Sequence, residues 1–167
     1  MTDTLWAPWR LDYIKSVTGQ TAECFLCDLA QHPENDAANF VIRRSPFGML
    51  LMNRYPYVNG HLLAAPYRHT PDLPELSAEE RADLFELAIL GQQLLARAMN
   101  PQGFNIGINI GRCAGAGVPG HVHTHIVPRW NGDVNFMSVV GQVRVIPQAV
   151  EEAYRQIMQQ LEKPPKR

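Results

Sequence analysis

The chain has 167 residues, a length that fits one domain with a hydrophobic core of useful size. Hydrophobic residues make up 46% and charged residues 19% of the sequence, as in a soluble globular protein. The formal net charge is −1, which excludes a global positive field that recruits nucleic acid, so any phosphate ligand must be bound by a few local groups.

The expected cellular setting follows from targeting signals and cysteines. Residues 1–6 have neither the basic nor the apolar region of a signal peptide, and no stretch approaches the ~18 consecutive apolar residues of a membrane span. The three cysteines, Cys24, Cys27 and Cys113, are few and odd in number, which argues against a disulfide framework and fits a reducing compartment. We therefore expect a cytoplasmic protein with no membrane or nucleic-acid partner.

The N-terminal half predicts an arm, a loop and three short strands. Residues 1–20 form an aromatic-rich arm, broken by Pro8, whose Trp6 and Trp9 we expect to pack on the core or on a second subunit. Residues 28–37 are polar and predict a loop. Apolar runs and the turn signal Asn59-Gly60 predict strands at 39–44, 48–52 and 61–65.

The C-terminal half predicts two helices and two strands. Ser77 and Glu80 form a capping box, and apolar residues then recur at helical spacing until Asn100-Pro101 ends the pattern. The order of elements predicts an α+β fold, with an antiparallel meander sheet and helices on one face. We expect one domain over 1–167, with a frayed tail at 163–167. The remaining elements are a strand at 104–110, a glycine-rich loop at 111–120, a strand at 121–127 and a helix at 148–161.

Three histidines alternate along the last predicted strand. Because side chains of a strand alternate faces, His121, His123 and His125 share one face, with imidazoles roughly 7 Å apart. A neutral imidazole can attack phosphorus and form a phosphoramidate, while flanking imidazoles bind charge or donate a proton. The glycines of the preceding loop let backbone N–H groups approach phosphate oxygens. The pattern therefore predicts that one imidazole of this row attacks the phosphorus of a phosphate ligand.

Two different interpretations of this histidine row stay open. Three histidines that serve only the core are rare, because every buried nitrogen then needs a hydrogen-bond partner. A three-histidine metal site is the stronger of the two, since His-x-His on a strand can bind zinc.

The pair Cys24 and Cys27 supplies two of the four ligands that zinc needs. With no second such pair in the chain, histidines must complete the set, and His69 and His121 allow a Cys2His2 site that ties the N-terminal arm to the sheet. The alternative is a thioredoxin-like redox pair. The absence of an evident helix beginning at Cys24 argues against this alternative. Cys113 is interpreted as an ordinary loop thiol.

The segment His-Val-His-Thr-His-Ile-Val at 121–127 matches the signature of the histidine triad (HIT) superfamily. The resemblance covers most of the chain: residues 53–61 resemble the family's Asn…Gly-His segment. Residues 5–10 and 109–136 resemble the branch of bacterial diadenosine tetraphosphate (Ap4A) phosphorylases. The resemblance implies a HIT-like fold with one long and one C-terminal helix, in a homodimer whose sheet is continuous across the pair.

The resemblance also implies a role for each matching residue. His123 is the nucleophile, His125 assists the leaving group, and hydrogen bonds of His61 support the triad. Asn53 falls where related hydrolases contact the ribose, and Asn109 and Gly117 fall where this branch contacts phosphate. The implied catalytic set is therefore His61, His121, His123 and His125.

Related galactose-1-phosphate uridylyltransferases pair a Cys-x-x-Cys with two histidines. That likeness implies a structural zinc and no organic cofactor. The implied zinc ligands are Cys24, Cys27, His69 and His121.

One position departs from a neighbouring branch of the family. Fragile-histidine-type hydrolases carry a glutamine four residues before the first triad histidine, where this chain has Gly117. The small residue counts against hydrolase chemistry of their kind and is compatible with the phosphorylase branch.

We therefore expect a nucleotidyltransferase that cleaves Ap4A to ADP and ATP, with inorganic phosphate as acceptor and a covalent AMP-histidine intermediate. The runner-up is a HIT-family hydrolase of Ap4A or nucleoside phosphoramidates, with water as acceptor. Two further candidate functions stay open: a non-catalytic nucleotide-binding module, and a metal-dependent enzyme that uses all three triad histidines.

Overall fold

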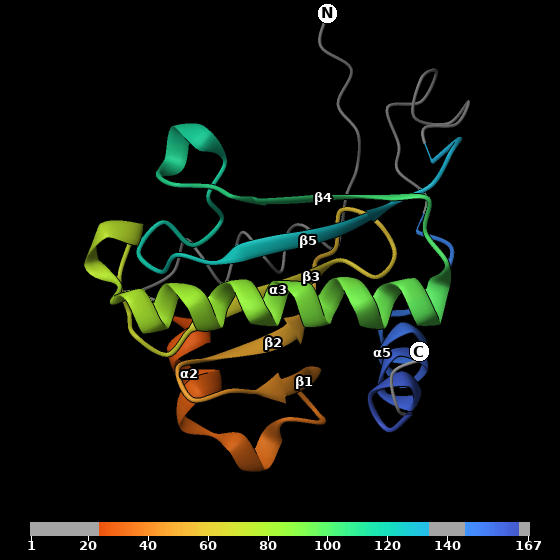
Figure 1. The fold of residues 1–167 in the computed structure, drawn as a ribbon, viewed down its shortest axis with the longest axis horizontal. Helices are drawn as coiled ribbons and strands as arrows, with labels where there is room; N and C mark the ends of the chain where they lie inside the picture. The colour runs from red at the N-terminus through yellow and green to blue at the C-terminus, as the bar shows by residue number, and fades with distance from the viewer. Residues whose placement is uncertain (1–23, 134–145, 164–167) are drawn as a thin grey trace, which may run out of the picture.

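The computed structural model describes residues 24–133 and 146–163, so the predicted arm with Trp6 and Trp9, and residues 164–167 of the predicted tail, lie outside the described residues. Three helices and five strands make up the described fold (Figure 1). The helices are α2 (Phe25–Gln31), α3 (Ala78–Met99) and α5 (Val150–Leu161). The strands are β1 (Val41–Arg44), β2 (Gly48–Met52), β3 (Leu62–Pro66), β4 (Gly103–Ile108) and β5 (Thr124–Arg129).

The five strands form one antiparallel sheet in the order β1-β2-β3-β5-β4. The first three strands are a meander, as predicted, and the β4–β5 connection brings β5 back between β3 and β4. This arrangement places Leu63 of β3 directly opposite His125 of β5. Because side chains alternate along β3, His61 lies on the same face as Leu63 and therefore near His125.

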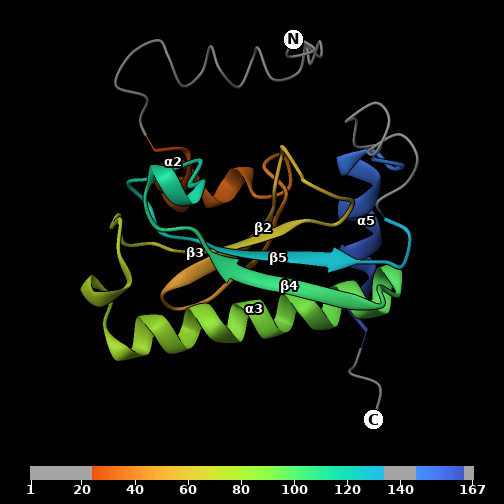
Figure 2. The same cartoon turned by 90° about the horizontal axis from the view of Figure 1, so that it is seen from above.

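The sheet is covered by helices on both faces. Figure 2 shows α3 along one face and α2 on the other. The core beneath α3 contains Leu50, Leu62 and Ile126. Buried residues of α5 belong to the same core. Leu26 and Leu29 of α2 pack against the opposite face, so the prediction of helices on one face alone is wrong for α2.

The long helix α3 follows its sequence signals. Ser77 Oγ accepts the backbone N–H of Glu80, and the Glu80 carboxylate accepts the backbone N–H of Ser77, which is the predicted capping box. Asn100 ends the helix in the left-handed conformation, before Pro101. Among the described residues, no helix combines the length and the apolar composition needed to cross a bilayer.

Several boundaries differ from the prediction, and three of the differences have a structural reason. Residues 28–31 are helical rather than loop, because Leu26 and Leu29 bury one side of α2 against the sheet. Strand β1 begins at Val41, after Phe40 turns the chain with a positive φ of 59°. Strand β5 begins at Thr124, three residues later than predicted, because Val122 donates its backbone N–H to Thr70 and not to the β-ladder.

The loop that carries His61 is fixed against the end of α3. Gly60 has a φ of 74°, and a Cβ built there would lie 2.7 Å from Met99 Sδ and 2.9 Å from a methyl group of Leu95. Gly132 has a similar φ of 79°, but a Cβ there would have no neighbour within 4 Å. A substitution at Gly132 therefore introduces backbone strain alone, whereas the same substitution at Gly60 introduces backbone strain and steric crowding.

We predict that Gly60→Ala destabilises the protein more than Gly132→Ala does. Both variants force a left-handed alanine, at about 1 kcal/mol, and only the first also makes the side chains of Met99 and Leu95 move aside. Urea denaturation of both variants and the wild type measures the two free energies of unfolding. Equal decreases in the free energy of unfolding would show that the loop around Gly60 can move and is not held in place by α3.

Candidate active site and metal centre

Four histidines gather on the face of the sheet that α3 does not cover. His61, His121, His123 and His125 are all buried, with at most 8% of each residue exposed. The rings of His123 and His125 meet edge to face, with centroids 4.9 Å apart. This distance is shorter than the roughly 7 Å expected between alternate side chains of an ideal strand.

A backbone carbonyl fixes the tautomer of His123. Its Nδ1 lies 2.8 Å from the carbonyl oxygen of His121, which can only accept, so Nδ1 carries the proton. The lone pair is then on Nε2. Burial lowers the pKa of His123 below its ordinary value, and the bond to His121 partly offsets this effect. His123 is therefore a neutral imidazole with a free Nε2 at pH 7.

A second backbone group fixes the tautomers of His61 and His125. The peptide N–H of Tyr57 donates to His61 Nδ1 over 3.1 Å, so the proton of His61 is on Nε2. Nε2 of His61 donates in turn to Nδ1 of His125 over 2.9 Å. His125 consequently carries its own proton on Nε2.

Both of these histidines are neutral at physiological pH. Burial, with repulsion from His125 and His123, lowers the pKa of His61 to about 3. Burial, with repulsion from His123, lowers the pKa of His125 to about 4. His125 can thus serve as a hydrogen-bond donor of fixed direction and not as a cation.

Asn109 lies beside His125. Its Nδ2 is 3.5 Å from Nε2 of His125, and both atoms carry protons. Two donors that face each other without an acceptor favour an anionic oxygen between them. Gly117 is exposed in the loop before β5.

Asn53 is engaged within its own loop. Its Nδ2 lies 3.2 Å from His61 Nδ1, and its Oδ1 accepts the backbone N–H of Tyr55 over 2.9 Å. Asn53 therefore orients His61 in this structure, a contact that the sequence did not suggest for it.

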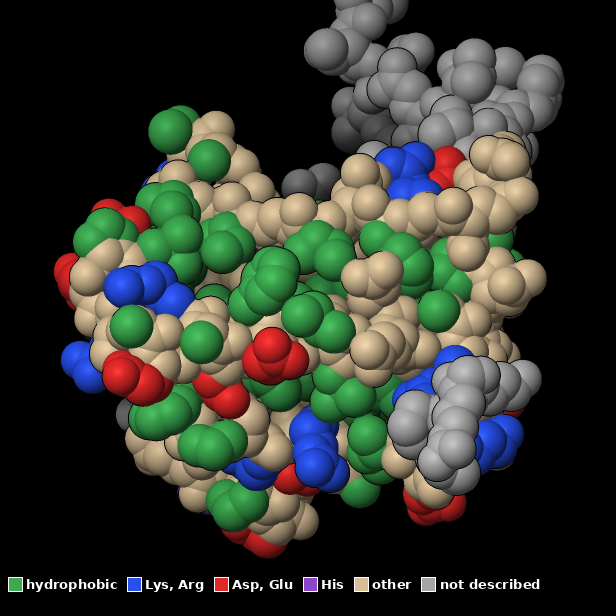
Figure 3. All heavy atoms as spheres, in the orientation of Figure 1, with side chains coloured by type: hydrophobic (Ala, Val, Ile, Leu, Met, Phe, Trp, Pro, Cys, Tyr) green, Lys and Arg blue, Asp and Glu red, His purple; other side chains and the backbone are tan. Residues whose placement is uncertain are grey.

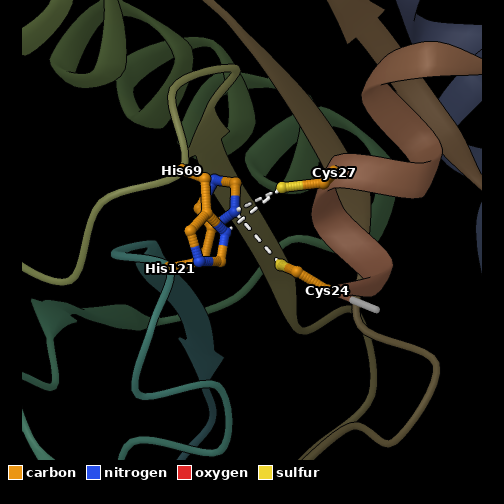
Figure 4. A group of neighbouring side chains, drawn as sticks. All are labelled: Cys24, Cys27, His69 and His121. Atoms are coloured by element: carbon orange, nitrogen blue, oxygen red, sulfur yellow. Dashed lines mark hydrogen bonds between the residues drawn. The ribbon is translucent and has the colours of Figure 1, made fainter. Parts of the chain in front are cut away.

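The ring of His121 points toward two cysteines (Figure 4). Its Nε2 donates to the carbonyl of Pro66 over 2.8 Å, which leaves the Nδ1 lone pair 3.2 Å from Cys24 Sγ and 3.5 Å from Cys27 Sγ. Nδ1 of His69 is 3.2 Å from Cys27 Sγ. The four donor atoms all lie within 4.8 Å of one another.

The donor set fits tetrahedral zinc. Bonds of ~2.0–2.3 Å to sulfur and nitrogen place the ligand atoms roughly 3.3–3.8 Å apart, close to the distances found here. Burial and the neighbouring Cys24 raise the pKa of Cys27 to about 11, so a bound cation is what favours its thiolate. The predicted residues Cys24, Cys27, His69 and His121 thus form one cluster.

The structure bears on two competing interpretations, a metal site made of the three triad histidines and a redox pair made of the two cysteines. The three triad histidines do not converge on a metal, since His121 faces the cysteines and Nδ1 of His125 faces His61. In the part of the chain that the structure describes, the Cys2His2 cluster is the group found to suit a metal. The expectation that no helix begins at Cys24 is wrong, because Cys24 is the N-cap of α2. The metal interpretation depends instead on the two histidines that face the sulfurs.

Two contributors were not predicted from the sequence. Tyr57 fixes His61 through its peptide N–H, and the Pro66 carbonyl fixes His121. The aromatic residues beside the Asn59-Gly60 turn are a signal that could have drawn attention to Tyr57. A carbonyl offers no such signal, since every residue has one.

The chain is similar to several known proteins. A family model described as the HIT domain matches residues 34–132. A protein of Mycobacterium tuberculosis named AP-4-A phosphorylase is 33% identical over 156 residues, which cover 90% of this chain and 80% of that protein. An asymmetrical bis(5′-nucleosyl)-tetraphosphatase of Schizosaccharomyces pombe is 38% identical over 93 residues, or 56% of this chain and 50% of that protein. The crystal structure of a Zn-bound histidine triad family protein from Mycobacterium smegmatis superposes with a TM-score of 0.66 at 28% identity, covering 87% of this chain and 94% of that one.

We predict that His61 and His125 stay neutral, with the proton on Nε2, down to pH 5.5. Their pKa values of about 3 and about 4 lie below that pH, so neither ring gains a second proton. Long-range ¹H–¹⁵N NMR correlations distinguish the two tautomers and the imidazolium directly. A charged ring or an Nδ1–H tautomer for either residue would contradict the hydrogen-bond chain from Tyr57.

Proposed function

This chain belongs to the HIT family, and from that premise we propose that it is a nucleotidyltransferase that cleaves Ap4A with inorganic phosphate, to ADP and ATP. The observation that carries the proposal is the fixed tautomer of His123. Its Nδ1 donates to a carbonyl, which leaves the Nε2 lone pair for attack, and its ring meets the ring of His125, whose Nε2 carries a proton. A nucleophile next to an oriented donor suits transfer of a phosphorus group.

The first step transfers AMP to the protein. A bond forms between Nε2 of His123 and the α-phosphorus of Ap4A, while the bond from that phosphorus to its bridging oxygen breaks, and the electron pair leaves with ATP. The imidazole ring becomes positive, and its Nδ1–H bond to the His121 carbonyl strengthens. His125 and Asn109 donate to the charged oxygens.

The leaving group needs no acid from the protein. The released oxygen becomes part of a terminal phosphate, whose second pKa is about 6, so it is stable without a proton near pH 7. A neutral His125 that donates a hydrogen bond is therefore sufficient, in agreement with its lowered pKa.

The second step frees the histidine. An oxygen of inorganic phosphate attacks the phosphorus, the P–N bond breaks, and its electron pair returns to Nε2, giving ADP. The similarity to AP-4-A phosphorylase over most of both chains, and the small Gly117, support phosphate as the acceptor. Water is the alternative acceptor, which the likeness to the tetraphosphatase supports.

We further propose that Cys24, Cys27, His69 and His121 hold a structural zinc. Its charge would neutralise the two thiolates, and no step of the reaction passes through it. The chain's own link between the two sites is His121, whose ring faces the cysteines and whose carbonyl orients His123.

A homodimer and a cytoplasmic location stay predictions. The edge strand β4 supports the dimer, because edge strands offer unpaired backbone groups to a second copy. Ile106 on this strand and Ile110 beyond it are 43% and 42% exposed. Figure 3 shows hydrophobic side chains in a band across this face of the molecule, over β4 and α3.

Product analysis tests the proposed function. We predict that Ap4A with inorganic phosphate yields ADP and ATP on anion-exchange chromatography, and that omitting phosphate stops turnover. His123→Asn should lose more than about 90% of turnover, since the amide cannot replace the nucleophile. AMP and ATP formed without phosphate would instead make the protein a hydrolase. Tight nucleotide binding without any turnover would indicate that the protein is a non-catalytic nucleotide-binding module.

Metal analysis tests the zinc site. We predict about one zinc per chain in the wild type and less than about 0.2 in Cys27→Ser, whereas Cys113→Ser, outside the cluster, keeps its zinc. Removing the metal should lower the melting temperature, because it releases α2 from the sheet. If a chelator abolished turnover at an unchanged melting temperature, the metal would have to take part in the reaction.

A further inference from the structure

The ring of Tyr57 lies on the outside of the two oriented histidines. It stacks on His125 with centroids 5.7 Å apart and planes 28° apart, and it tilts over His61 at 4.6 Å. Tyr57 is 43% exposed, whereas His61 is 0% and His125 is 8% exposed. The ring is therefore the outermost of three aromatic rings, and much of its surface is open.

The ring is not needed for the hydrogen-bond chain. The contact that fixes His61 comes from the peptide N–H of Tyr57, which any residue other than proline supplies. The side chain can therefore be replaced without removing the group that sets the tautomers.

The position of the ring relates it to the leaving group. In the proposed reaction, the Nε2–H of His125 faces the oxygens at the reacting phosphorus, and Nδ2 of Asn109 lies 3.5 Å from that nitrogen. A nucleotide that leaves past His125 passes the exposed ring stacked on that histidine. A nucleobase has a flat π-face, and stacking on an exposed tyrosine is a common way to bind one.

We propose that Tyr57 forms a stacking subsite for the nucleobase of the leaving nucleotide. The subsite makes the protein select dinucleoside polyphosphates over substrates whose leaving group has no base. This inference rests on the proposed function, because it takes the direction of departure from that reaction.

The test compares two substrates that transfer the same AMP group. Ap4A releases ATP, whereas adenosine 5′-tetraphosphate releases tripolyphosphate, which has no base. In Tyr57→Ala, kcat/KM for Ap4A should fall about 5- to 100-fold relative to kcat/KM for adenosine tetraphosphate, the range that one base–aromatic stack provides. Tyr57→Phe keeps the π-face and should hold the ratio within about twofold of the wild type.

Two results would overturn the inference. Equal losses on both substrates would mean that the ring acts only through His61 and His125. No loss on either substrate would mean that the ring contacts no leaving group. The matched control is Phe85→Ala, which removes an aromatic ring that is 66% exposed on α3 and away from the histidines, and it should leave the ratio unchanged.

A binding measurement separates this inference from the proposed function. Calorimetry with His123→Asn, alone and combined with Tyr57→Ala, gives Kd values for Ap4A and adenosine tetraphosphate without turnover. Loss of the preference for Ap4A in the double variant supports the subsite even if the wild type turns over neither substrate. Equal Kd values for the two ligands in His123→Asn would contradict it.

Discussion

The site depends on backbone groups whose hydrogen-bonding role cannot change. A carbonyl only accepts and a peptide N–H only donates, so each one determines which nitrogen of a neighbouring imidazole carries the proton. The carbonyls of His121 and Pro66 and the N–H of Tyr57 act in this way on His123, His121 and His61. Burial keeps these rings neutral, so the pattern persists at pH 7. One free nucleophilic nitrogen and one oriented donor result.

The same short segment serves the Cys2His2 cluster and the proposed nucleophile. His121 directs its ring to Cys24 and Cys27, and its carbonyl to His123 two residues later. Alternation along an extended chain places both histidines on one face, while Val122 between them packs beneath α3. Order at the cysteine cluster is therefore transmitted to the nucleophile over two residues. Through this connection, the proposed zinc would affect activity without touching the substrate.

Much of the fold follows from local sequence signals. Strand β2 and the capping box of α3 lie where predicted, because alternation and capping are properties of neighbouring residues. The short helix α2 was missed because it depends on Leu26 and Leu29 meeting the sheet, which is a tertiary contact. In the site, side-chain identity was enough to anticipate the four members of the metal cluster. It was not enough for the tautomers or for the contact of Asn53 with His61, which require positions in space.

The central claim is that His123 is the residue that carries the nucleotidyl group. The most direct measurement is to mix the protein with Ap4A in the absence of phosphate, quench at neutral to alkaline pH, and locate the adduct by peptide mass spectrometry. We predict AMP on His123, and disappearance of that adduct when phosphate is added. AMP found on His125 or a different residue, or direct transfer with no adduct at early times, would contradict the claim.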